Sequence, residues 1–315
     1  PAAGSFTTLT ASGAESLKSS YGLFRKDDPL EVAWTKTGNG TAESQTDIYV
    51  EVNGTVLTIS SGTSIDMPSL SAGTDYAIWA ETDGSLQASS NHTTPPSANA
   101  RKVGGFHYAP GSNASGTSGG DTTAQINEYS FWDLKFKPSC PDPRGMTLVA
   151  DAFWSDIYLT GVDHHTNGTS KYNVTIADGS SPPKVPSEFG GNGATTYGTY
   201  TWFEANELLF SHGKRAPTYT EFAALAYGTT EASARGSDPS TTQMSATDDN
   251  FTSKWGVIQS TGCMRVWGRD FIASGDGYAF SDGRARLSWQ LARASSLTGC
   301  RERISTLNRC TGVGP

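Results

Sequence analysis

The sequence has few cysteines, no long apolar run and, between Arg265 and Arg309, no lysine. Four cysteines without a CxxC pair argue against a zinc ribbon or a dense disulfide framework; three pairings are open to them, and we expect free thiols. No apolar run approaches the ~18 to 20 residues that a membrane span needs, and no signal-peptide pattern follows Pro1, so we expect no membrane insertion and no anchor. A net charge of −8 argues against a nucleic-acid partner.

The composition favours β structure. Only 36% of the residues are hydrophobic, Gly is abundant at 35 residues, and Ser plus Thr supply about a quarter of the chain. This balance is more usual in turn-rich β proteins than in helical bundles. A length of 315 residues allows two domains of about 100 to 200 residues each. The composition therefore predicts a mainly β or α+β protein.

Two hairpins are predicted in the first third of the chain. Residues 47–59 alternate apolar and polar side chains and turn at Asn53-Gly54, which is the strongest short-range hairpin signal. Residues 75–89 repeat the pattern, with Tyr76, Ile78 and Ala80 on one face and Asp83-Gly84 expected to supply the positive φ angles of a tight turn. A short strand is expected over 101–108. A Gly/Ser/Thr-rich stretch then places a domain boundary near Ser130.

Two helices are predicted after that boundary. The first begins with the capping box Thr201 and Glu204, carries an apolar face at Phe203, Leu208 and Phe210, and stops at Gly213.

The second helix follows the same scheme. Thr218 and Glu221 form its capping box, Phe222, Leu225 and Ala226 lie at helical spacing, and Gly228 ends it. Short helices among strands indicate an α+β second domain rather than a doubly wound one.

Several long stretches carry a resemblance to a known family. The helix pair and a later Trp-bearing strand resemble the C-type lectin fold, in the branch shared by formylglycine-generating enzymes and the variable proteins of diversity-generating retroelements. A more specific resemblance is to the major tropism determinants, the receptor-binding tail-fibre proteins of temperate bacteriophages. It runs from about Phe24 to about Asp270 and is carried by "ARKVGGFHYAPGSN", "TTAQINEYSFWDLKF", "DPRGMTLVADAFWSDIYL" and "GTSKYNVTIADGS".

This resemblance implies a fold, an assembly and a location. It implies an antiparallel β-sandwich over 24–129, followed by a C-type lectin-like domain over 130–315 whose region from about 271 to 315 is hypervariable. It also implies a homotrimer in the virion, at the tip of a tail fibre, with other phage tail proteins as neighbours. The family's N-terminal β-prism has no match in residues 1–23, so the mode of attachment to the tail stays open.

The arginine-rich end of the chain is the predicted binding surface. Eight of thirteen arginines lie between Arg265 and Arg309. Arginine suits recognition because its planar guanidinium makes several hydrogen bonds and also stacks. The family resemblance implies that this surface binds a host-cell receptor, either protein or glycan. The predicted receptor-binding residues are Trp289, Arg293, Ser295, Leu297, Arg301, Arg303, Ile304, Thr306, Leu307 and Asn308.

The arginine-rich end also admits a different origin and different roles. The family pattern is matched only loosely beyond Phe271, so a reading-frame change or truncation there would also produce the abrupt arginine enrichment. A purely structural virion protein is a further alternative. A copper oxidase like the formylglycine-generating enzymes, using Cys300 and Cys310, is another, although the spacing of these cysteines is longer than in that family. We expect no enzymatic activity.

No cofactor and no metal site are predicted. Asp163, His164 and His165 have the residue types of metal ligands but lack an identifiable third ligand. Trp255 and Trp267 are expected to pack in the core rather than to form a carbohydrate platform. The last candidates are acidic residues whose spacing fits no calcium loop and which we expect to form solvated loops: Asp248, Asp249, Asp276 and Asp282.

Overall fold

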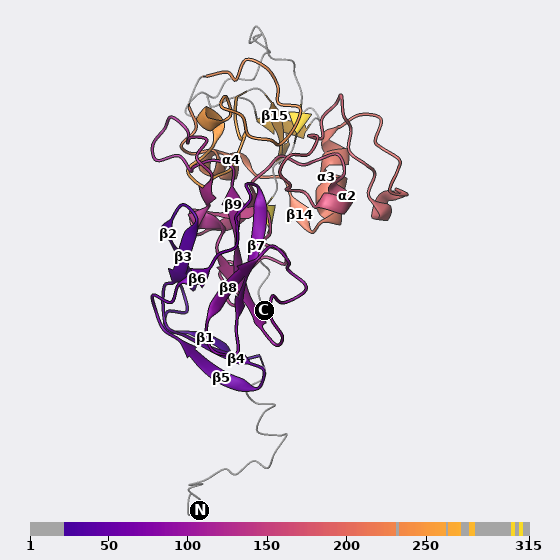
Figure 1. The fold of residues 1–315 in the computed structure, drawn as a ribbon. Helices are drawn as coiled ribbons and strands as arrows, with labels where there is room; N and C mark the ends of the chain where they lie inside the picture. The colour runs from indigo at the N-terminus through magenta and orange to yellow at the C-terminus, as the bar shows by residue number, and fades with distance from the viewer. Residues whose placement is uncertain are drawn as a thin grey trace, which may run out of the picture.

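The chain folds mainly into strands. The computed structural model describes residues 22–230, 233–262, 264–271, 277–280, 304–305 and 309–310. Five sheets and a few short helices make up this part (Figure 1), which confirms the predicted mainly β, α+β class. None of the helices within these ranges has the length and apolar character needed to cross a bilayer.

The first sheet contains the predicted hairpin at Asn53-Gly54. Both turn residues have positive φ angles, 49° and 81°, as a two-residue turn of this type requires. Ile48 pairs with Ile59 and Val52 with Thr55, so the register is the predicted one. The antiparallel order is β1-β4-β5, and a separate hairpin, β2-β3, lies next in the chain: β1 (Phe24–Lys26), β4 (Ile48–Val52), β5 (Thr55–Ile59), β2 (Trp34–Gly38) and β3 (Thr41–Ser44).

A six-stranded sheet forms the other half of this region. Its order is β10-β9-β7-β8-β6, with β11 also pairing with β9: β6 (Ile65–Asp66), β7 (Thr74–Ala80), β8 (Leu86–Ser89), β9 (Arg101–Ala109), β10 (Gln125–Ile126) and β11 (Trp132–Asp133). The second predicted hairpin is present, but its turn is longer than expected. Ala80 pairs with Leu86, and only Gly84 of the Asp83-Gly84 pair has a positive φ. The Asp83 carboxylate instead accepts the Ser85 backbone N–H at 2.9 Å.

One continuous hydrophobic core joins these sheets. Phe24, Trp34, Ile48, Ile78 and Phe106 are buried together in it. A close approach fixes the middle strand, because a Cβ atom at residue 104 would lie 2.2 Å from Trp34 Nε1 and 2.5 Å from the Trp132 carbonyl oxygen. Only glycine fits there. The Trp34 indole therefore reaches that carbonyl and donates to it at 3.1 Å.

The second half of the described chain has shorter elements and longer connections. Two sheets, of orders β12-β13-β18-β14 and β16-β15-β17, contain β12 (Met146–Val149), β13 (Phe153–Asp156), β14 (Lys214–Arg215), β15 (Arg265–Phe271), β16 (Gly277–Phe280), β17 (Ile304–Ser305) and β18 (Arg309–Cys310). The α-helices are α2 (His164–Asn167), α3 (Trp202–Ser211) and α4 (Tyr219–Leu225). Three 3-10 turns complete the set: η1 (Glu128–Ser130), η2 (Ser187–Phe189) and η3 (Asp249–Phe251).

The two predicted helices are present, and both capping boxes are formed. On the predicted apolar face of α3, Leu208 is buried as predicted, but the assignment of Phe203 and Phe210 to that face is wrong. Phe203 and Phe210 are 60% and 78% exposed, whereas the buried residues are Ala205, Leu208 and Leu209. Residues seven apart lie on the same side of a helix, so burying the second set necessarily turns both phenylalanines outward. In α4, Phe222 and Leu225 are buried as predicted.

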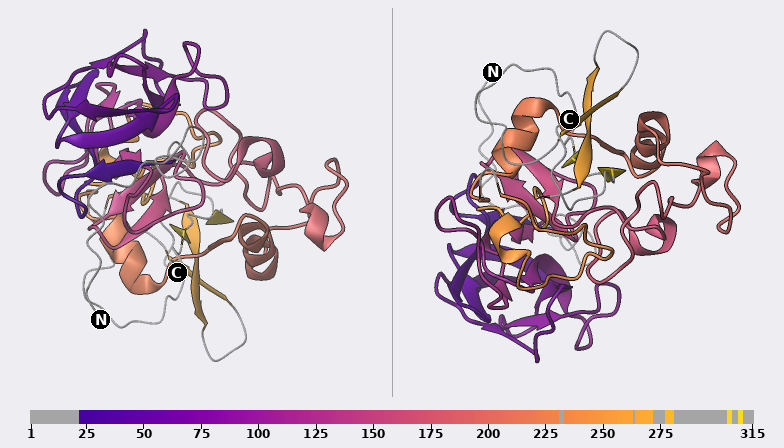
Figure 2. Two further views of the ribbon diagram at one scale, coloured as in Figure 1. Left: turned by 90° about the horizontal axis from the view of Figure 1, so that it is seen from below. Right: turned by 90° about the horizontal axis from the view of Figure 1, so that it is seen from above.

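The molecule is elongated. β1, β4 and β5 lie at one end, and α4 and β15 lie at the other (Figure 1). The segment around η2 extends sideways from the body in both further views (Figure 2). β11, which follows Ser130, pairs with β9 of the first region. The domain limits at 23/24 and 129/130 and the sandwich arrangement stay predictions.

Candidate receptor-binding platform

Most of the predicted receptor-binding residues lie outside the described residues. This holds for Trp289, Arg293, Ser295, Leu297, Arg301, Arg303, Thr306, Leu307 and Asn308. Ile304 is the exception, because its backbone belongs to β17 and pairs in parallel with Arg265 of β15. The structure therefore describes the strands that precede and follow residues 281–303, which contain most of the predicted surface, and both strands pair with β15.

β15 lies between these two strands. β16 pairs with it antiparallel, with Val266 opposite Phe280, and β17 pairs with it on the other side. The chain thus leaves the sheet at Phe280, on one side of β15, and rejoins it at Ile304, on the opposite side. We call the sheet β16-β15-β17, with the N-terminal ends of α3 and α4, the β15 platform.

The N-terminal end of α3 is tied to β15 by two tryptophans. Trp202, the first residue of the helix, donates from its indole Nε1 to the Gly268 carbonyl at 2.7 Å. Trp267 donates from Nε1 to the Tyr200 carbonyl at 3.1 Å. The first bond is donated by the helix to the strand, and the second is donated by the strand to the residue two positions before the helix. Together they fix the N-terminal end of α3 against β15.

The N-terminal end of α4 is tied to the same strand. The Arg269 backbone N–H donates to the Pro217 carbonyl at 2.8 Å, and the Tyr219 N–H donates to the Asp270 carboxylate at 2.7 Å. A carboxylate is favourable here, since the first N–H groups of a helix lack intrahelical partners and carry partial positive charge. Arg215 holds the capping residue Glu221 through two hydrogen bonds of 2.9 Å.

Tryptophan packing in this region agrees with the sequence prediction. Trp255 packs beside Val257 and Phe222 and donates to the Ala224 carbonyl at 2.8 Å. Trp267 packs against the α3 core formed by Ala205 and Leu208. Both side chains are partly buried, and both indole N–H groups donate to backbone carbonyls. The β15 platform is thus a strand held to two helix ends by four hydrogen bonds.

The acidic candidates do not form a cation site within the described ranges. Asp248 is fully buried and accepts from Arg235 Nε at 2.6 Å, so the prediction of a solvated loop is wrong for this residue. Its charge is compensated by an arginine and by the Ser245 hydroxyl and N–H. Asp276 and Asp282 lie outside the described residues. Over the part of the chain that the structure covers, no three His, Cys, Asp or Glu side chains are grouped as metal ligands.

His164 has a partner that sequence spacing did not reveal. Its Nδ1 lies 2.9 Å from Nε2 of His212, which is 48 residues away and follows α3. His165 beside it is exposed. Desolvation is the main cause that lowers the pKa of His164 and takes the pKa of His212 to about 4. Both imidazoles are therefore neutral near pH 7.

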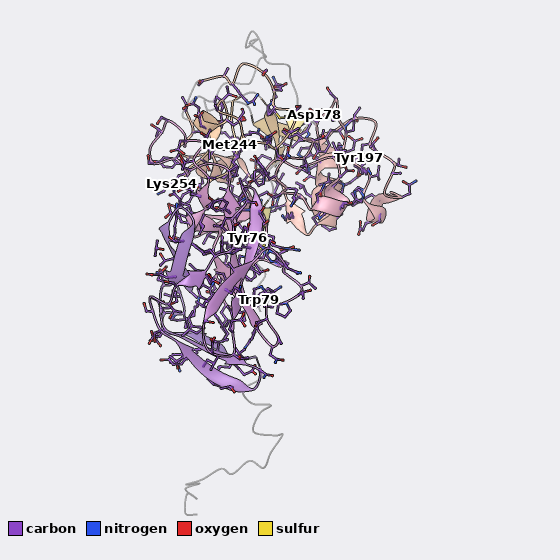
Figure 3. All side chains as sticks on the ribbon, in the orientation of Figure 1. Tyr76, Trp79, Asp178, Tyr197, Met244 and Lys254 are labelled. Carbon is purple, nitrogen blue, oxygen red and sulfur yellow. The ribbon has the colours of Figure 1, made fainter. Side chains whose placement is uncertain are left out.

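A buried Asp–His–Tyr chain has no signal in the sequence. His107 Nδ1 lies 2.8 Å from Asp75, and its Nε2 lies 2.9 Å from the Tyr158 hydroxyl. The order of groups is that of a nucleophile, base and carboxylate, but Tyr158 is buried. Burial raises the pKa of its hydroxyl well above the usual value, so the hydroxyl stays protonated and is shielded from solvent. The chain joins β7 and β9 to the second region. Figure 3 shows Tyr76, the residue after Asp75 in β7, near the middle of the long axis of the molecule.

Burial would raise the pKa of Asp75, yet it is lowered. Attraction to His107, the hydrogen bond from that ring and the bond from the Gly145 N–H outweigh desolvation. An ionised carboxylate that is hydrogen-bonded to His107 of β9 and to the Gly145 N–H links the two regions.

Comparison with known proteins identifies the family. The model of the "Mtd second domain" matches residues 32–133. A "Tail fiber receptor-binding protein" of Bordetella phage BPP-1 is 56% identical over 257 residues, which cover 79% of this chain and 68% of the relative. The solved structures of the P3c and M1 variants of the Major Tropism Determinant match with a TM-score of 0.80 and 46% identity, covering 91% of this chain and 85% of each variant.

The agreement of fold and sequence confirms the resemblance seen in the sequence. The overlap extends beyond the first region, since 91% of the chain superimposes on these structures. Their mostly β, C-type lectin-like fold is the fold of this protein. The chain therefore belongs to the major tropism determinant family of phage tail-fibre proteins.

Proposed function

We propose that this protein attaches a phage to a host-cell receptor through the chain displayed from the β15 platform. The observation that carries the proposal is the 56% identity to a tail-fibre receptor-binding protein over most of the chain. The platform supports it physically, because two helix ends are hydrogen-bonded to β15, and β15 pairs with the strands that precede and follow residues 281–303. As a tail-fibre protein, the chain is a virion component.

The contact residues in this proposal are the ten predicted from the sequence between Trp289 and Asn308. Arg293, Arg301 and Arg303 supply planar donors that suit carboxylates and aromatic faces. The receptor is a protein or a glycan. Sequence variation at these positions, of the kind that a diversity-generating retroelement produces, would change the partner while leaving the clamped strand intact.

The protein acts by binding rather than by catalysis in this proposal. The named relatives are receptor-binding tail-fibre proteins. Among the described residues, the one triad-like chain ends on a buried tyrosine rather than on an accessible nucleophile. Cys310 has its backbone in β18, and Cys300 lies outside the described residues, so no observed geometry favours the copper-oxidase alternative.

A triple substitution tests the binding surface. Replacing Arg293, Arg301 and Arg303 by Ser should abolish adsorption of the purified chain to host cells, measured by flow cytometry. The unfolding free energy should change by no more than about 0.5 kcal/mol per site, as is usual for surface substitutions. The control replaces Arg25 and Arg144, two exposed arginines outside the platform, by Ser and should keep full adsorption.

The same assay separates the alternatives. A chain ending at Phe271 should lose adsorption if the proposal is right. If that truncation binds host cells as the intact chain does, the arginine-rich segment has no part in attachment, as a frame-changed end would predict. If the intact chain itself does not adsorb to any host strain that the phage infects, a purely structural role in the virion is favoured instead.

We also propose a homotrimer, in contact with other phage tail proteins. Three copies would multiply a weak single-site contact through avidity. Multi-angle light scattering at micromolar concentration should give about three times the chain mass of 33.3 kDa. A mass of one chain at that concentration would exclude a stable trimer, while leaving the adsorption result unaffected.

A further inference from the structure

A lobe of the chain beside α3 is held by a small number of contacts. Residues 178–200, the side lobe, extend away from the body (Figure 2) and contain η2 as their one regular element. Lys184 is the main point of attachment. Its N–H donates to the Val162 carbonyl at 3.1 Å, its carbonyl accepts from the His164 ring at 2.7 Å, and its Nζ lies 3.0 Å from Asp163.

Another contact lies further along the lobe. The Tyr197 hydroxyl donates to the Glu207 carboxylate of α3 at 2.9 Å, and Figure 3 shows Tyr197 close to that helix. The lobe is thus fastened to α2 at Lys184, and near its C-terminal end to α3 at Tyr197 and to β15 through the Tyr200 carbonyl. Thr199 adds a hydrogen bond to Glu204 of α3. The first fastening passes through His164, which also contacts α3 at His212.

The hydrogen bonds fix the protonation of both imidazoles. The Lys184 carbonyl can only accept, so His164 carries its proton on Nε2 and leaves Nδ1 as an acceptor. His212 must then donate from its Nε2. The ring centroids are 5.1 Å apart, nearly the N···N distance plus both ring radii, so the two nitrogens point straight at each other. This is the geometry of an N–H···N hydrogen bond rather than of two ligands converging on a metal ion.

We propose that the His164–His212 pair is an acid-sensitive latch, which fastens the side lobe to α3 near neutral pH and releases it when both imidazoles are protonated. The geometry gives the order of events. The first proton enters at Nδ1 of His212, which leaves the N–H···N bond in place. A second proton at Nδ1 of His164 would set two N–H groups against each other at 2.9 Å, and the bond would be lost.

Charged groups on every neighbouring element act on the pair. Asp163 and His165 lie on either side of His164 in the chain, and Glu188 of the lobe attracts a proton on both rings. Lys214 of β14 repels a proton on His212, while Asp156 of β13 attracts one. Lys214 and Asp156 are themselves paired at 2.6 Å, so their effects on His212 largely offset each other.

Burial is therefore the main reason why the pKa values of both histidines are lowered. Desolvation takes the pKa of His212 to about 4, below the ordinary value of 6.5, and also lowers the pKa of His164. The released form, with ordinary pKa values, binds more protons than the closed form between about pH 6.5 and pH 4. The latch is consequently strongest above this window and weakens as the pH falls through it.

Hydrogen–deuterium exchange of residues 178–200 tests the latch. After correction for intrinsic exchange rates, we expect protection in these residues to fall about tenfold or more between pH 7 and pH 4; the full pKa difference would give a larger factor, but partial exposure of His212 screens it. The variant His212→Gln keeps an N–H donor near the position of Nε2 without titrating in this range. Its lobe should lose clearly less protection than that of the unaltered protein over the same interval, because only His164 of the pair still titrates.

The matched control is His165→Gln, which makes the same chemical change at the exposed neighbour and should behave as the unaltered protein does. In addition, NMR of the imidazole Cε1–H groups should place the His212 midpoint near pH 4. The proposal fails if His212 titrates near pH 6.5, or if His212→Gln loses lobe protection at pH 4 as the unaltered protein does. The titration is measured on the unaltered chain, so it decides the question even if the variant folds poorly.

Discussion

The strand region (residues 22–133) and the helix-and-loop region (residues 134–271) hold their backbones in different ways. In the strand region, β4 pairs with β5 and β7 with β8, so neighbouring strands in the chain are neighbours in space. In the helix-and-loop region, β12 also pairs with the next strand, β13, but β13 and β15 pair in addition with β18 and β17, which lie beyond residue 271 and are distant in the chain. Loops there are fixed by side chains such as Asp178, whose carboxylate accepts the N–H groups of Ser180 and Ser181.

The hydrophobic cores of the two regions also differ. The strand region has one large hydrophobic cluster, to which all three of its sheets contribute. The helix-and-loop region has several smaller clusters, one around Phe222, another around Leu208 and others around Trp154 and Tyr158. A fold divided in this way can change one loop without disturbing a distant cluster. This is the property required of a protein that varies its contact surface and keeps its scaffold.

The largest effect is expected from a substitution in the continuous core. Trp34→Ala should lower the unfolding free energy by about 3 to 5 kcal/mol, because it leaves a cavity against Gly104 and removes the bond to the Trp132 carbonyl. Guanidinium denaturation measures the loss. Leu30→Ala, at a side chain that is 77% exposed, is the control and should cost within about 0.5 kcal/mol. If Trp34→Ala lowered the unfolding free energy by less than about 1 kcal/mol, the core around Trp34 would not be tightly packed.

The same contrast accounts for how much of the fold could be predicted from the sequence. Turn chemistry at Asn53-Gly54 and the capping boxes at Thr201 and Thr218 act within a few residues, and each is found as predicted. The buried face of α3 depends on what packs against the helix. Hydrophobicity alone assigns Phe203 and Phe210 to the core, although the helix buries its smaller and aliphatic side chains instead.

Less of the candidate site than of the fold could be predicted from the sequence. Resemblance placed the binding surface after Phe271, but nothing local in the sequence shows that Trp202 and Asp270 would tie two helix ends to β15. These bonds span 66 and 51 residues. The His164–His212 contact spans 48 residues and has no signal in either local sequence. Such pairings follow from topology, which single-residue patterns do not specify.

The smallest effect is expected at the cap of α4, where the comparison between the regions can be sharpened. Thr218 accepts the Glu221 N–H, and Glu221 in return accepts the Thr218 N–H at 3.0 Å. Thr218→Ala removes the first bond and should cost about 1 kcal/mol, while Thr218→Ser keeps the hydroxyl and should cost much less. Hydrogen–deuterium exchange should show the loss in residues 218–226 and in β15, which this helix end holds through Asp270, and β4 and β7 should keep their protection. Equal loss of protection in β4 would mean that the two regions open as one unit. The difference between one continuous core and several smaller cores would then have no counterpart in the stability of the two regions.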